Sequence, residues 1–162
     1  MIRYGILFVL LFGTALAQQN AEVTIYNPKA DAARELREAE SKAAKEHKHL
    51  LVQVGGNWCS WCVKLEKLYR SNDTVAAMLR EHYVLVHLNY SKENKNLPLL
   101  ARYGYPQRFG FPVLLVLDAR GNRLHTQDSG LLEQGGAHSA EKVLAFLSKW
   151  TPAALDPKQY RE

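Results

Sequence analysis

The chain has 162 residues, of which 47% are hydrophobic and 23% are charged, and its formal net charge at pH 7 is +5. This length predicts one domain with a real hydrophobic core, and the composition excludes wholesale disorder. Basic residues are interspersed with acidic ones, as in RELREAESKAAKEHK, which is typical of a solvated helix face and argues against a nucleic-acid-binding surface.

Residues 1–17 are predicted to be a signal peptide. A positively charged start precedes a mostly apolar run over 6–16, and the small residues of ALA at 15–17 fit the pattern of a cleavage site. The run is shorter than the roughly 20 residues of a spanning helix, and no cysteine directly follows it, so we expect neither a stable membrane anchor nor a lipid anchor. The expected mature chain, 18–162, is one exported domain, periplasmic or secreted, with its core over about 23–150 and a polar C-terminal tail.

Short apolar runs alternate with amphipathic segments along this domain. The predicted elements, in chain order, are a strand over 21–26, a helix over 31–47, a buried strand over 49–54, a helix from Cys59, a helix over 73–80 capped by Asp73, a strand over 83–88, a helix over 97–103, a strand over 113–117, a returning strand over 123–127 and a helix after Ser139. Such an order predicts an α/β fold, a mixed central sheet with helices on both faces.

Both cysteines of the chain lie in the segment GGNWCSWC, three positions apart. A disulfide that closes so small a loop removes little chain entropy, so the spacing favours chemistry over stapling. Haem attachment needs a histidine where Val63 stands. A structural zinc site needs four ligands, for which only His47 and His49 precede the motif nearby. A reversible disulfide between Cys59 and Cys62 is therefore favoured, with no metal and no cofactor.

The helix that begins at Cys59 gives the two thiols different environments. Cys59 lies beside unpaired backbone N–H groups and the positive end of the helix dipole, which stabilise a thiolate. Cys62 lies one turn later on the same side of the helix. From there it can attack a mixed disulfide on Cys59 and release the product.

The motif GGNWCSWC after the strand HLLVQV resembles the active site of the thioredoxin superfamily, and the element order is similar. These proteins carry a cis proline at the start of a later strand, and FGFPVLLVLDARGNRL places Pro112 there, with Pro106 as the alternative. The resemblance is greatest to secreted or periplasmic thioredoxin-like proteins of the disulfide-reductase and isomerase type. It implies that Cys59 is the nucleophile, Cys62 resolves, and Pro112 presents backbone to an extended substrate.

The resemblance also implies supporting residues around the thiols. Trp58 would cover the active site, with core packing as its alternative role. Ser60 and Trp61 lie between the cysteines, and Trp61 is either a substrate-facing aromatic or a shield for Cys62. Phe111 precedes the cis proline. The implied partners are protein thiols and disulfides and an unidentified redox partner, and we expect a monomer.

Two positions depart from the thioredoxin pattern. Thioredoxins carry a buried aspartate where this chain has Gln53, and a lysine where it has His87. One interpretation is that both are satisfied core polar residues. The other is a proton relay, in which Gln53 orients His87 and the imidazole accepts the proton of Cys62.

The predicted function is thiol–disulfide exchange with exported protein substrates, by a reductase or isomerase rather than an oxidase. The residues between the cysteines match neither thioredoxins nor strong oxidases, so the sequence does not predict the reduction potential. The alternative is a protein-binding module of the same fold whose disulfide stays closed.

Overall fold

A four-stranded mixed sheet forms the centre of the computed structural model, which describes residues 24–161. β1 pairs in parallel with β2, whereas β3 runs antiparallel to both β1 and β4. The spatial order is β2–β1–β3–β4, so β1 and β3 are the central strands. The strands are β1 (His49–Gly55), β2 (Tyr83–Asn89), β3 (Val113–Leu117) and β4 (Arg123–Asp128).

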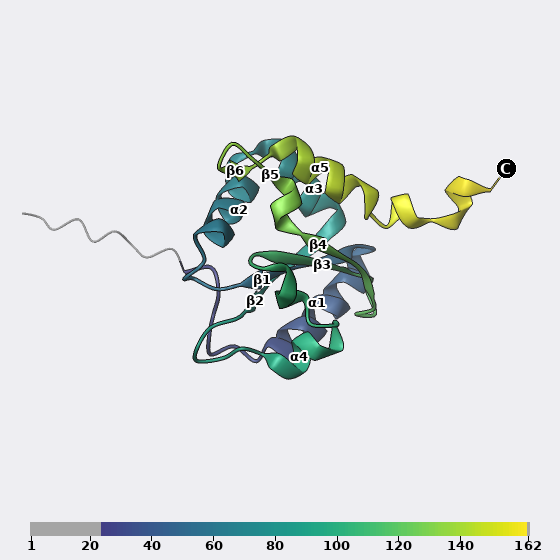
Figure 1. The fold of residues 1–162 in the computed structure, drawn as a ribbon. Helices are drawn as coiled ribbons and strands as arrows, with labels where there is room; N and C mark the ends of the chain where they lie inside the picture. The colour runs from purple at the N-terminus through teal and green to yellow at the C-terminus, as the bar shows by residue number, and fades with distance from the viewer. Residues whose placement is uncertain (1–23, 162) are drawn as a thin grey trace, which may run out of the picture.

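Helices cover both faces of this sheet (Figure 1). α1 (Ala32–Glu46) and α4 (Leu97–Arg102) lie on one face. α2 (Ser60–Ser71), α3 (Asp73–His82) and α5 (Ala140–Lys149) lie on the other. The predicted fold class, an α/β domain with a mixed sheet between two layers of helices, is confirmed. Past α5, the C-terminal residues extend away from the domain (Figure 1).

Strand β1 is buried on both faces because helices lie above and below it, which explains its nearly continuous apolar sequence. Successive side chains of a strand point to opposite faces. Leu50, Val52 and Val54 accordingly join the apolar cluster under α1, whereas Leu51 joins the cluster under α2, α3 and α5. By the same alternation, Gln53 points toward the α2 side, and it is fully buried there.

The strand predicted over 21–26 is wrong where the structure describes it, because residues 24–26 form no strand. One side chain takes the place of a neighbouring strand. The backbone N–H groups of Ile25 and Tyr26 donate to Asn57 Oδ1 at 2.9 and 3.0 Å, and Asn57 Nδ2 donates to the Tyr26 carbonyl at 2.9 Å. This segment is thereby tied to the loop that carries the cysteine motif.

Two other differences from the predicted elements are local. Asn72, not Asp73, caps α3, since its side chain accepts from the Val75 N–H. A small hairpin of β5 (Glu133–Gln134) and β6 (Ala137–His138), which the sequence pattern did not indicate, packs beside α2.

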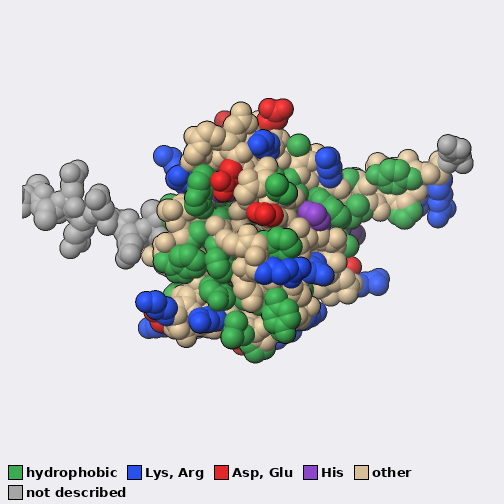
Figure 2. All heavy atoms as spheres, in the orientation of Figure 1, with side chains coloured by type: hydrophobic (Ala, Val, Ile, Leu, Met, Phe, Trp, Pro, Cys, Tyr) green, Lys and Arg blue, Asp and Glu red, His purple; other side chains and the backbone are tan. Residues whose placement is uncertain are grey.

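The predicted signal peptide over 1–17 lies outside the described residues. Within the described part of the chain, no helix is both long and apolar enough to cross a membrane. On the face shown in Figure 2, basic and acidic side chains are scattered among hydrophobic ones, and neither sign forms one continuous patch.

Candidate active site

Cys59 and Cys62 form a disulfide where the loop after β1 enters α2, with their Cα atoms 5.2 Å apart. Cys59 is the N-cap of α2, and its Sγ accepts a hydrogen bond from the Cys62 backbone N–H at 3.1 Å. The helix N-terminus therefore directs an N–H group and its partial positive charge at the first sulfur, which favours a thiolate there. Cys59 is 5% exposed and Cys62 is not exposed, so solvent reaches only the first cysteine.

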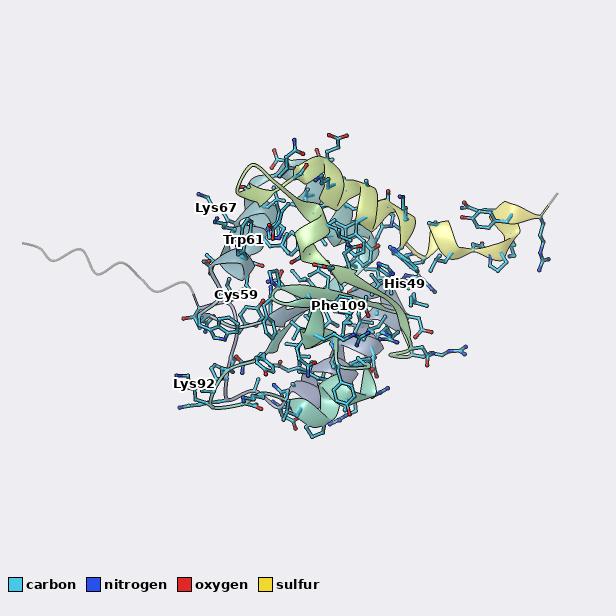
Figure 3. The ribbon with its side chains drawn as sticks, in the orientation of Figure 1. His49, Cys59, Trp61, Lys67, Lys92 and Phe109 are labelled. Atoms are coloured by element: carbon cyan, nitrogen blue, oxygen red, sulfur yellow. A yellow bond between two sulfur atoms is a disulfide. The ribbon has the colours of Figure 1, made fainter. Side chains whose placement is uncertain are left out.

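An aromatic group lies beside the disulfide. Trp58 is 59% exposed, which rules out the core-packing alternative for this residue. Its indole N–H donates to the Tyr90 carbonyl at 2.7 Å, and its ring meets the Phe111 ring edge-on at 5.3 Å. Trp58 and Tyr90 also line a pocket with residues 91–93 and Lys95. Figure 3 shows Lys92, from this loop, and Cys59 on the same side of the molecule.

Pro112 directly precedes β3, and the Phe111–Pro112 peptide bond is cis. Phe111 is half-buried and packs against the cluster that contains both cysteines, so this dipeptide lies next to the disulfide. The Pro112 carbonyl accepts a hydrogen bond from the Ser129 hydroxyl. Pro106 instead begins a short 3₁₀ turn, and its peptide bond is not among the cis bonds of the described chain.

Trp61, between the cysteines, is half-buried and held by the β5–β6 hairpin. Its ring meets the His138 ring edge-on at 5.3 Å, and Lys64 Nζ lies 4.1 Å from the ring centroid. Lys64 also donates to the Gly136 carbonyl at 2.8 Å, which ties the hairpin to α2. Burial, with a smaller effect from the Lys64 charge, lowers the pKa of His138 to about 4. Ser60 is exposed at the first position of α2.

Gln53 and His87 are partners in the parallel register of β1 and β2 and therefore lie side by side on the α2 face. Their hydrogen bonds, however, go to other residues. Gln53 Nε2 donates to the Tyr26 hydroxyl at 2.7 Å, and His87 Nε2 lies 2.9 Å from Glu66 Oε2. The predicted neighbourhood is present, but Gln53 does not orient His87 in this structure.

Glu66 is a site residue that the sequence interpretation missed. It lies on α2 one turn after Cys62, is 5% exposed, and bonds His87 through one carboxylate oxygen and Arg70 Nε, at 2.6 Å, through the other. The hydrogen bond with His87 outweighs burial and holds the pKa of Glu66 below its ordinary value. The i,i+4 spacing from Cys62 was the available signal, because such residues share a helix face.

The histidines before the motif, which the sequence offered as zinc ligands, lie away from the cysteines. His49 begins β1, whereas the cysteines follow its other end, and Figure 3 shows His49 and Cys59 on opposite sides of the molecule. His49 Nδ1 is bonded to the Trp150 carbonyl at 2.8 Å. No group of three or more His, Cys, Asp or Glu residues within 24–161 is arranged to hold a metal ion.

A disulfide at the start of a helix after a central strand, with a cis proline beside it, defines a thioredoxin-fold protein with a CxxC site. The chain belongs to the thioredoxin-like family, whose model matches residues 30–119. Its cysteine pair within this fold makes it a thiol–disulfide oxidoreductase.

Known proteins with similar sequences and structures carry related names. The chain is 29% identical over 119 residues to the disulfide bond reductase DsbH of Chlamydia pneumoniae, covering 68% of this chain and 69% of the relative. The crystal structure of a disulphide isomerase from Xylella fastidiosa Temecula1 matches with a TM-score of 0.70 and 29% identity, over 80% of this chain and 98% of that one. A DsbH oxidoreductase structure matches at 24% identity with a TM-score of 0.51, over 82% of this chain and 92% of that one, which shows the fold alone.

Proposed function

We propose that this protein reduces or isomerises disulfide bonds in exported proteins, with Cys59 as the nucleophile and Cys62 as the resolving thiol. The observation that carries the proposal is the asymmetry of the two sulfurs. Cys59 caps α2 and retains contact with solvent, whereas Cys62 is fully buried. A substrate disulfide therefore meets the sulfur that the helix terminus stabilises as a thiolate.

The proposed reaction has two exchange steps. The Cys59 thiolate attacks one sulfur of the substrate disulfide, which forms a mixed disulfide and releases the first substrate thiolate. Cys62 then loses its proton and attacks Cys59 Sγ, which closes the Cys59–Cys62 bond and releases the second substrate thiolate. Two electrons pass to the substrate, whose sulfurs take up two protons, one released by Cys62 and one from solvent, where Cys59 left its proton on becoming a thiolate. A dithiol partner must then reduce the protein again.

The surroundings of Cys59 suit a protein substrate. Trp58 presents an exposed aromatic surface, and Phe111 and the cis proline lie next to the disulfide. We assign strand-like pairing of an extended substrate to the backbone at this edge, which is a general way for a peptide to bind. The names of the two relatives with 29% identity, a reductase and an isomerase, favour these directions over oxidation. The apolar start of the sequence supports export.

Insulin reduction and a redox titration test this proposal together. Cys59→Ser should abolish turnover, and Cys62→Ser should accumulate mixed disulfides, whereas Ser148→Ala, on the remote helix α5, should behave as wild type. A reduction potential near roughly −270 mV would support a reductant, and one near roughly −120 mV would indicate an oxidant. A disulfide that resists reduction and exchanges with no protein would instead support the alternative function, a protein-binding module whose disulfide stays closed.

A further inference from the structure

Tyr26 places a hydroxyl group near the resolving cysteine. The residue is fully buried and packs in one cluster with Cys59 and Cys62. A Cβ atom built on Gly55 would lie 2.7 Å from the Tyr26 hydroxyl oxygen and closer still to Cys62 Sγ. The hydroxyl and the sulfur therefore both approach Gly55 closely, where a side chain would overlap them.

Two neighbours fix the position of this hydroxyl. Asn57, in the loop before Cys59, bonds the Tyr26 backbone through two hydrogen bonds and the neighbouring Ile25 N–H through a third. Gln53 Nε2 donates to the hydroxyl oxygen at 2.7 Å. The oxygen thus already serves as an acceptor, while its own proton has no acceptor among the described residues. A buried hydroxyl donor without a partner is costly, because it has lost its bond to water.

The charge state of the phenol matches a donor role. Burial raises the pKa of Tyr26, and the nearby Glu66 carboxylate raises it further, so the residue stays neutral at physiological pH. Glu66, the charged group that acts on Tyr26, is already paired, since it bonds both His87 and Arg70. Tyr26 therefore combines a hydroxyl proton that has no acceptor among the described residues with a position in the same cluster as Cys62.

We propose that Tyr26 is a catalytic residue that donates a hydrogen bond to the Cys62 sulfur when this becomes a thiolate. The inference rests on the proposed function, because it concerns the resolving step. In the closed disulfide, Cys62 Sγ is an uncharged, weak acceptor. In the thiolate it is a charged acceptor, and hydrogen bonds to charged groups are about twice as strong as neutral ones.

The stabilisation is therefore specific to the reacting state, which is the condition for it to raise the rate. Cys62 releases its proton, which passes to the departing substrate thiolate, and its sulfur attacks Cys59 Sγ while Tyr26 holds the developing charge. Tyr26 keeps its own proton throughout. Gln53 acts as a positioning residue in this scheme, since it donates to the tyrosine oxygen and turns the hydroxyl proton away from itself.

The decisive experiment titrates Cys62 alone. In the Cys59→Ser protein, Cys62 is the only thiol, and ultraviolet thiolate absorbance against pH gives its pKa. Adding Tyr26→Phe keeps the ring and removes the hydroxyl, and it should raise that pKa by about one unit. With Cys59 present, release of the mixed disulfide at neutral pH should slow about threefold, because the tenfold loss of thiolate is partly offset by higher nucleophilicity.

Tyr83→Phe is the matched control. It also removes a buried tyrosine hydroxyl, one that donates to the Leu147 carbonyl at 2.6 Å, on the strand β2 and away from the cysteine cluster. This control should lose stability without changing the Cys62 titration. Gln53→Leu removes only the positioning donor and should raise the Cys62 pKa by a smaller amount than Tyr26→Phe does. If Tyr26→Phe does not fold, the Gln53→Leu titration tests the role of the Tyr26 hydroxyl in its place.

The outcomes separate this inference from the proposed function. An unchanged Cys62 titration in folded Tyr26→Phe would overturn the role of Tyr26, whatever the protein does to insulin. A wild-type protein that reduces no substrate while its Cys62 titration still depends on Tyr26 would overturn the proposed function and leave the hydrogen bond standing.

Discussion

The two faces of the central sheet are built differently. The buried cluster under α1 and α4 consists of aliphatic side chains and Tyr103. The face under α2 has an apolar cluster as well, but at the disulfide end it also buries Tyr26, Gln53 and Glu66, with His87 half-buried beside them. Buried polar and charged groups cost free energy unless they are paired, and on the second face Glu66 is paired with His87 and Arg70, whereas Gln53 Oε1 has no partner among the described residues.

The same two strands serve both faces, because their side chains alternate. In β1, Val52 and Val54 pack under α1 while Gln53 points to α2. In β2, Val86 and Leu88 pack under α1 while His87 points to α2. The comparison teaches that a substitution on the apolar face should change stability alone. A substitution one residue away, on the polar face, should change the reactivity of Cys59 and Cys62.

The largest expected effect is on the apolar face. Leu115→Ala removes a fully buried side chain from the centre of the cluster under α1 and should lower the free energy of unfolding by about 2–5 kcal/mol. The reduction potential and the reactivity of Cys59 should not change. Urea denaturation and a redox titration measure the two quantities, and a shifted potential would break the proposed division between the faces.

Gly55→Ala tests the close approach on the polar face. The new methyl group would meet the Tyr26 hydroxyl at 2.7 Å and would overlap Cys62 Sγ, so the oxidised protein should lose about 1–3 kcal/mol. Gly130→Ala is the control, since its nearest contact is the movable Asp128 carboxylate at 3.1 Å. Equal denaturation midpoints for the two variants would show that the space at Gly55 is not tight.

His138, which packs beside α2, should make the stability of the domain sensitive to mild acid. The pKa of His138 falls from 6.5 to about 4 on folding because of burial, so the unfolded chain binds the proton first. The free energy of unfolding should therefore decrease as the pH falls from 6.5 toward 4. His138→Phe retains an aromatic partner for Trp61 and should flatten this part of the profile, measured by denaturation at several pH values with pH 8 as the reference. An identical slope in the variant would contradict the burial argument.

The smallest expected effect is the acid response of Glu66. Because folding lowers the pKa of Glu66, its contribution is present above the ordinary value of 4.5 and is lost as the pH falls through the lowered value. Glu66→Gln should therefore make stability less dependent on pH below about 4.5. Glu38→Gln is the control, an exposed glutamate 3.9 Å from Arg34, whose surface pairing contributes little. If stability depends on pH in the Glu66→Gln protein as it does in wild type, this carboxylate does not contribute to the difference between the two faces.

Most of the fold could be predicted from the sequence because its signals are local. The apolar run over 49–54, the helical spacing over 31–47 and the hairpin turn before β4 each lie within a few neighbouring residues. The prediction that failed also rested on a local signal. The alternation over 21–26 resembled a strand, yet the structure satisfies the backbone of Ile25 and Tyr26 with the side chain of Asn57 instead.

The sequence by itself determined the disulfide and its asymmetry, since Cys59 and Cys62 are one helical turn apart at a predictable helix start. Only the tertiary structure decided what lies beneath them. Tyr26, Gln53, Glu66 and His87 come from four separate segments of the chain, and each could find several partners by its chemistry alone. The physical reason is that a buried polar group bonds whichever group the packed layers bring within reach, and that choice depends on strand register and helix placement rather than on sequence neighbours.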